Sequence, residues 1–93
     1  MEDPMSHLLA KAAEQQDLDR IDALLDAGAD IAWRHKGTGR TPLLSAVIAG
    51  KAASVARLLD RGANIEHACT ALGFTALGWA AERNDADIGR LLI

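Results

Sequence analysis

A repeated phrase constrains this chain more than any other feature of its sequence. Residues 22–31 read DALLDAGADI and residues 56–65 read ARLLDRGANI, so the two phrases begin 34 residues apart. The same offset pairs GRTPLLSA at 39–46 with GFTALGWA at 73–80. A fixed period of this length is typical of proteins that stack one small unit, because no unit can bury its apolar face alone.

The 34-residue offset also aligns apolar positions in rows of three. These rows are Leu9 with Leu43 and Leu77, Ala12 with Ala46 and Ala80, Leu24 with Leu58 and Leu92, and Leu25 with Leu59 and Ile93. We expect one domain over residues 5–93, with units at 5–38, 39–72 and 73–93, the last of them incomplete. Residues 1–4 (MEDP) precede a second methionine, and we interpret them as a cloning scar.

Each unit reads as two helices followed by a loop. In unit two, Thr41 is a favourable helix N-cap, and Pro42 suits the first helical position, where its missing N–H costs nothing. The apolar run that follows ends at Gly50, a residue type that often terminates helices in the left-handed conformation. The segments 31–40 and 65–74 contain glycine and lack helical periodicity, which predicts hairpin-like loops.

Composition and charge narrow the class of protein. The chain is 49% hydrophobic but has only two Trp, one Phe and no Tyr, which favours a core of closely packed helices over a sheet sandwich. No apolar run approaches the roughly 20 residues that span a bilayer, so we expect no membrane association. The net charge of −3 argues against nucleic acid as a partner. A single cysteine and the absence of a signal-type segment predict a cytoplasmic protein.

The segment GRTPLLSAVIAGKAASVARLLDRGANI at 39–65 resembles the ankyrin repeat, with its Gly-x-Thr-Pro-Leu start, Ala-rich first helix, Leu-Leu in the second helix and Gly-Ala-Asn end. The resemblance covers nearly the whole chain after residue 4. It implies an all-α ankyrin-repeat solenoid of stacked helix-turn-helix units, with the loops projecting as fingers. It also implies an extended concave surface that binds a partner. Such stacks rarely carry out chemistry.

The chain departs from the family pattern in several places. The family's histidine after Thr-Pro-Leu is Leu44 in unit two and Gly78 in unit three, so its usual hydrogen bonds are absent. The family's aspartate near the finger tip is replaced by Lys36 and Thr70. Unit one lacks Thr-Pro and is rich in polar residues, as expected of an N-terminal capping unit. Unit three has Gly89 inside its second helix, which predicts that this last helix is the least stable element.

The residues predicted to bind a partner lie in the fingers and on the first helix of unit three. They are Trp33, Arg34, His35, Lys36, Arg40, Phe74, Trp79 and Arg83. Tryptophan and arginine often dominate binding energy, and the first finger, WRHKGTGR, is basic in an acidic chain. Two alternatives remain open: the aromatic rings pack within the molecule, and the basic loop is only a solvated tip.

Three possible chemical sites are weaker interpretations. The stretch KGTGR lacks the Gly-Lys-Ser/Thr ending of a phosphate loop. His35, His67 and Cys69 fall on neighbouring fingers, but a closed zinc site normally needs four ligands. A Cys–His nucleophilic pair would need a third, orienting group. We therefore expect no enzyme activity, cofactor or metal, and we interpret His7 as a helix-start residue of the capping unit.

Two functions compete at this stage. The first is a protein-protein interaction module that presents its fingers and first helices to a partner of unknown identity. The second is a self-associating structural unit that covers its last repeat by end-to-end stacking or element exchange. The second hypothesis assumes that the final unit exposes an apolar face, because large uncovered apolar patches are uncommon on monomers. The residues predicted for this face are Leu77, Ala81, Ile88, Leu92 and Ile93.

Overall fold

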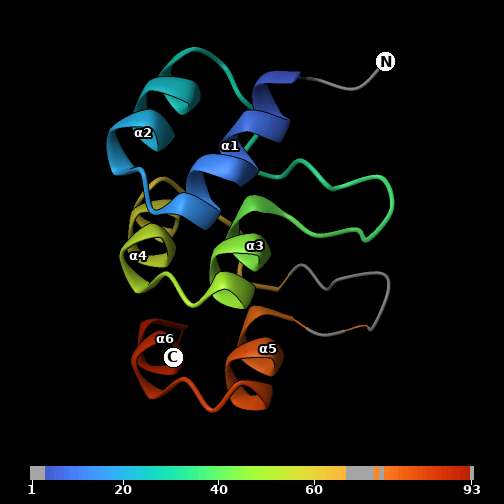
Figure 1. Ribbon diagram of the computed structural model, residues 1–93, viewed down its shortest axis with the longest axis vertical. Helices are drawn as coiled ribbons and strands as arrows, with labels where there is room; N and C mark the ends of the chain where they lie inside the picture. The colour runs from blue at the N-terminus through green and yellow to red at the C-terminus, as the bar shows by residue number, and fades with distance from the viewer. Residues whose placement is uncertain (1–3, 67–72, 74, 93) are drawn as a thin grey trace.

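The computed structural model describes residues 4–66, 73 and 75–92, and this part of the chain contains helices, turns and loops but no strand (Figure 1). Six helices occur in the described residues. They are α1 (Pro4–Gln15), α2 (Leu18–Asp26), α3 (Pro42–Ala49), α4 (Ala52–Asp60), α5 (Ala76–Glu82) and α6 (Ala86–Leu92). None of the helices in these residues is long and apolar enough to cross a membrane.

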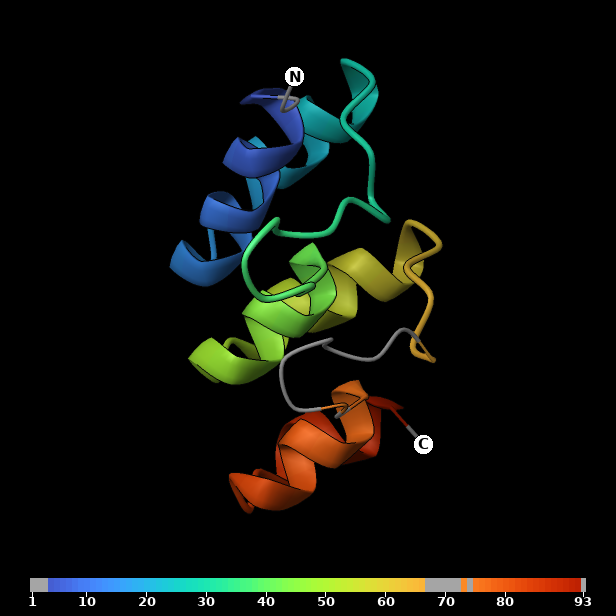
Figure 2. The same ribbon diagram turned by 90° about the vertical axis from the view of Figure 1, so that its right-hand side faces the viewer.

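The helices form three antiparallel pairs that stack along the long axis of the molecule. Figure 1 shows α1, α3 and α5 in one row and α2, α4 and α6 in a second row. Within the pairs, α1 packs on α2, α3 on α4 and α5 on α6, and between pairs each row continues from one unit to the next. Figure 2, turned by 90°, shows the same three layers from the loop side. The predicted all-α repeat stack is therefore confirmed.

The helix ends follow the predicted capping chemistry. Thr41 precedes α3, and its Oγ1 accepts a hydrogen bond from the Leu44 N–H at 3.2 Å. Thr75 caps α5 in the same way, with the Gly78 N–H as donor at 3.3 Å. Gly50 ends α3 in the left-handed conformation, with φ of 75°, which is where glycine avoids the strain that a Cβ would cause.

The leucine row at positions 9, 43 and 77 shows how each unit covers the one before it. Leu9 is 0% exposed and Leu43 is 1% exposed, because the next unit lies on each of them, whereas Leu77 in the final unit is 47% exposed. The core around the first two continues through both rows of helices. Its members are Leu9, Ala12, Ala13, Ile21, Ala29, Leu43, Leu44, Ala46, Val47, Val55, Leu58, Ala76, Ala80, Ile88 and Leu92.

The predicted outer face of unit three is wrong for two residues. Leu77 and Ala81 are exposed, but Ile88 is 0% and Leu92 5% exposed. The physical reason is that α6 packs against both α4 and α5, and residues four apart share one helix face, so both side chains point into the stack. The leucine that α6 exposes instead is Leu91. Ile93 lies outside the described residues.

Gly89 lies within α6 in a helical conformation, and a methyl group added there would meet nothing within 4 Å. We expect Gly89→Ala to stabilise the fold by about 0.5–1 kcal/mol, because alanine loses less conformational entropy in a helix. Urea unfolding followed by circular dichroism measures this change. Gly62→Ala is the matched control: that site is equally open, but its φ is 94°, so we expect a loss of about 1–2 kcal/mol. A neutral or harmful Gly89→Ala would contradict the prediction.

An ion-pair ladder joins the outer helices of units one and two, and the sequence analysis missed it. Arg57 on α4 pairs with Asp22 on α2, and Arg61 pairs with Asp26 at 2.6 Å and with Asp22 at 3.7 Å. The hydrogen bond to Asp26, together with the charges of both carboxylates, raises the pKa of Arg61 above its usual value. Such partly exposed pairs stabilise a fold weakly and are screened by salt. In unit three, Leu91 stands at the position of Arg57, so the Arg57 ion pair has no counterpart in the described part of that unit.

Candidate partner-binding site

The first finger is a tight loop closed by main-chain hydrogen bonds. The His35 N–H donates to the Arg40 carbonyl at 2.8 Å, and the Gly39 N–H donates to the His35 carbonyl at 2.7 Å. The Arg34 guanidinium adds a hydrogen bond to the Gly39 carbonyl at 3.2 Å. The predicted hairpin-like finger is thus present as a series of turns. The second finger, predicted over 65–74, lies mostly outside the described residues.

The base of the first finger is fastened to α1. Ser6 is fully buried, and its Oγ accepts a hydrogen bond from the Asp30 N–H at 2.8 Å. His7, the next residue of α1, meets the Trp33 ring edge-on, with 5.7 Å between ring centroids. His7 is therefore not a helix-start residue as predicted, since α1 begins at Pro4. Its ring belongs to the contact between helix and finger.

His35 completes an aromatic cluster with His7 and Trp33. Its ring centroid lies 6.0 Å from that of Trp33 and 6.4 Å from that of His7. The Nδ1 of His35 accepts a hydrogen bond from the Gly37 N–H at 3.1 Å, so in the neutral ring the proton is carried by Nε2. In this tautomer the Nε2–H of His35 is available as a hydrogen-bond donor.

A cleft of about 260 Å³ lies between the finger and the first helices. The cleft is lined by side chains from α1, the first finger and α3. They are His7, Ala10, Lys11 and Glu14 from α1, Trp33, His35, Thr38 and Arg40 from the finger, and Ser45 from α3. The cleft combines one large apolar ring with cationic, anionic and neutral polar groups, which is the kind of lining that orients a bound segment.

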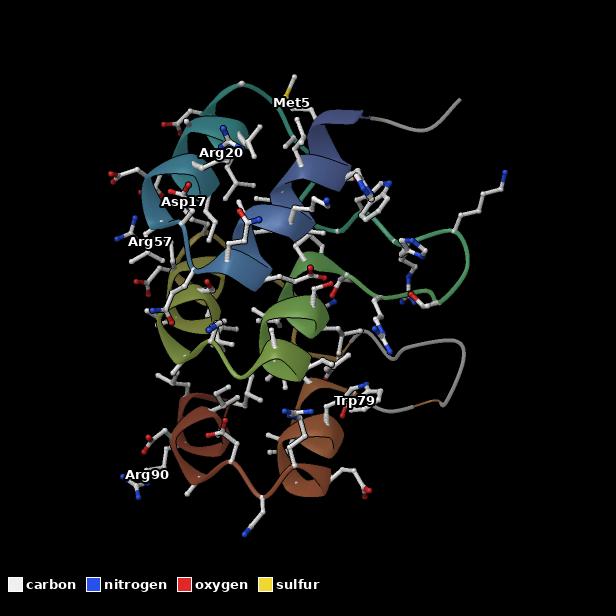
Figure 3. The ribbon with its side chains drawn as sticks, in the orientation of Figure 1. Met5, Asp17, Arg20, Arg57, Trp79 and Arg90 are labelled. Atoms are coloured by element: carbon white, nitrogen blue, oxygen red, sulfur yellow. The ribbon has the colours of Figure 1, made fainter. Side chains whose placement is uncertain are left out.

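Arg40 links this cleft to unit three. Its guanidinium carbon lies 5.7 Å from the centroid of the Trp79 ring, within the range of a cation–π contact. Trp79 is half-buried on α5, on the finger side of the stack (Figure 3). The alternative that Trp79 packs within the molecule is therefore supported, because Arg40 occupies one face of its ring. A role for Trp79 in partner binding stays a prediction.

The remaining predicted site residues are less closely grouped. Lys36 is exposed at the finger tip and Arg83 is exposed at the C-terminal cap of α5, and neither is among the residues that line the cleft. Phe74, His67 and Cys69 lie outside the described residues. Among the residues that the structure describes, no group of three possible metal ligands comes together.

Sequence reasoning missed the contribution of α1 to the cleft. His7, Lys11 and Glu14 line it together because positions three and four apart share one face of a helix. That spacing was the available signal: the family resemblance already implied that the exposed sides of first helices bind partners. The sequence did not indicate that the first finger folds back over α1.

The fold is a helical repeat stack with a cleft beside its first finger. A family description of three ankyrin repeats matches residues 9–93, and the chain belongs to the ankyrin-repeat family. The chain is also 37% identical over 59 residues to the human protein described as a 2-5A-dependent ribonuclease. That match covers 63% of this chain but spans only 8% of the ribonuclease. Ankyrin repeats are, in general, protein-binding modules.

Proposed function

We propose that this chain binds a partner protein through the cleft formed by α1, the first finger and α3. The observation that carries the proposal is the half-buried Trp33 ring, which lines the cleft and makes T-shaped contacts with the rings of His7 and His35. A rigidly held tryptophan supplies a large contact area at little cost in conformational entropy. Under this proposal the chain binds and does not catalyse.

The surroundings of Trp33 resemble the centre of a binding surface. Hot-spot residues are enriched in Trp and Arg and sit in pockets from which a partner can exclude water. Trp33 and Arg40 both line the cleft, and neither depends on a long flexible loop for its position, because the His35–Arg40 and Ser6–Asp30 hydrogen bonds fix the finger. A partner would therefore meet a surface that is already formed.

We expect Trp33→Ala to weaken partner binding at least about tenfold while leaving the helical content unchanged. The immobilised wild-type protein and the variant are used to capture partners from a lysate, and the affinity of each captured protein is then measured with purified components. Arg90→Ala is the control, since Arg90 lies on α6 on the opposite side of the stack from the fingers (Figure 3). Undiminished binding by Trp33→Ala would show that the binding surface lies outside this cleft.

Self-association is a second candidate because of one observation. Leu77 is exposed at the register position where Leu9 and Leu43 are covered by a following unit. Beside it is a hollow of about 210 Å³ between α5 and α6, lined mostly by small side chains and by Gly89. A second copy that places an apolar side chain on this face would bury Leu77 as its counterparts are buried.

We expect Leu77→Lys to convert any oligomer of this chain to monomer, because a charge cannot be buried in such a contact without a partner. Light scattering during size exclusion measures the mass of wild type and variant over a range of concentrations. Ile65→Lys is the matched control, since Ile65 is similarly exposed but follows α4 in unit two. A wild-type chain that stays monomeric throughout would remove this candidate.

A further inference from the structure

We propose that the cleft at the first finger selects an acidic segment of its partner protein, and that an aspartate or glutamate carboxylate binds between Arg40 and Lys11. The inference rests on the proposed function and adds the chemistry of the partner. It is carried by the charges that line the cleft, by the uncommitted donors of Arg40 and by the size of the cleft.

The charge around the cleft is opposite in sign to that of the whole chain. Lys11 and Arg40 line the cleft, and Arg34 and Lys36 follow Trp33 on the same finger. Glu14 is the one carboxylate among the residues that line the cleft, although the chain as a whole has a net charge of −3. A cationic patch on an acidic protein attracts anionic groups locally and speeds their encounter with the site.

The donors of Arg40 are not committed to an acid in the described part of the chain. Its main chain is occupied: the N–H donates to Thr38 Oγ1 at 3.3 Å, and the carbonyl accepts from His35. Its side-chain Nε is buried and has no hydrogen-bond acceptor among the described residues. Its guanidinium carbon lies 5.7 Å from the centroid of the Trp79 ring, and the group forms no ion pair with the described residues. The buried Nε is closed off from the surface, so a partner's carboxylate would meet the terminal nitrogens of the guanidinium, and a carboxylate is the acceptor that fits this group best.

The other groups of the cleft suit a carboxylate on an aliphatic stem. Trp33 offers an apolar face for methylene groups, and a neutral His35 offers its Nε2–H as a further donor. The volume of about 260 Å³ is below the range of roughly 300–1,000 Å³ that is usual for small-molecule sites. The cleft therefore fits one or two side chains of a docked segment better than a whole nucleotide. Glu14 further disfavours a polyphosphate, because like charges repel.

The test begins with an unbiased probe, a random dodecapeptide library displayed on phage and selected against the wild-type protein. We expect the eluted peptides to be enriched in Asp and Glu over Lys and Arg, and we expect Trp33→Ala to abolish the enrichment. The most enriched peptide is then synthesised with each acidic residue changed to its amide. At least one change is expected to weaken binding about tenfold or more, the effect of losing a charge-assisted hydrogen bond.

Variants of the protein locate the carboxylate. We expect Arg40→Gln and Lys11→Gln each to weaken binding of the acidic peptide several-fold, and Glu14→Gln to strengthen it. All three effects should be smaller in high salt. Lys11 and Glu14 are exposed on α1, so these two variants remain informative if loss of the Arg40–Trp79 contact unfolds the first variant. Peptides selected without acidic enrichment, or a Glu14→Gln variant that binds more weakly, would overturn the inference.

Two further outcomes separate this inference from the proposed function. If captured partner proteins depend on Trp33 but not on Arg40, Lys11 or Glu14, the cleft binds protein and the acidic selection is wrong. If captured partners do not depend on Trp33 at all, the proposed function itself fails. ATP serves as the last probe. If ATP binds at this cleft without displacing the selected peptide, or if ATP binds and none of the peptides does, the cleft is a nucleotide site and the inference is wrong.

Discussion

Leu43→Ala is expected to destabilise the chain by about 2–5 kcal/mol, the range found for removing a fully buried leucine. Leu43 is 1% exposed on α3, the central helix of its row, which packs against both α1 and α5. The substitution leaves a cavity at the position where the following unit covers α3. Since small domains are stable by only about 5–15 kcal/mol, the variant loses a large part of its stability. Urea unfolding followed by circular dichroism measures the loss.

Leu77→Ala is the matched control, because it makes the same substitution at the same register position of the last unit. Leu77 is 47% exposed, so less apolar surface is returned to water and no cavity forms. We expect a cost below about 1 kcal/mol. Equal losses for the two variants would contradict the view that each unit is stabilised by the unit stacked on it.

Ile88→Ala is expected to detach unit three while units one and two stay folded. Ile88 is fully buried where α6 packs on α4 and α5, so its truncation costs about 2–5 kcal/mol. The stability of a repeat stack is a sum of unit and interface contributions, and a terminal unit is held at one interface only. The loss therefore falls on α5 and α6 rather than on the whole chain.

Hydrogen exchange of backbone amides distinguishes local from global opening in the Ile88→Ala variant. We expect rapid exchange in α5 and α6 and retained protection in α1 to α4. Leu91→Ala is the control from the neighbouring turn of the same helix, since Leu91 is 41% exposed. Uniform loss of protection along the chain would show that the three units unfold as one.

The repetition in the sequence was sufficient to predict most of the fold. The 34-residue register predicted the stack, and the Thr41 and Gly50 signals predicted the ends of α3. The predicted exposure of Ile88 and Leu92 on α6 was wrong. Leu92 was placed on the outer face with Leu77 and Ala81, although it shares its register with Leu58, which is buried. The repeat itself contained the correction, because equivalent positions face the same neighbour.

The candidate site was predictable only in part, because side chains from different units come together through the path of the finger. Trp33 and Arg40 were named from the sequence, and both line the cleft. His7, Lys11 and Glu14 were not assigned to the site, because their spacing places them on one helix face but does not indicate which loop folds over that face. The contact of Arg40 with Trp79 spans two units, and such a pairing depends on tertiary geometry rather than on residue spacing.

The way in which the first finger holds its shape has a consequence for protein engineering. Its bend depends mainly on the main-chain bonds between His35, Gly39 and Arg40, and the exposed tip residue Lys36 contributes its side chain to none of them. New recognition sequences can therefore be grafted at the tip without rebuilding the scaffold beneath it. A library randomised around Lys36 would retarget the molecule, provided that the anchoring pair of Ser6 and Asp30 is left intact.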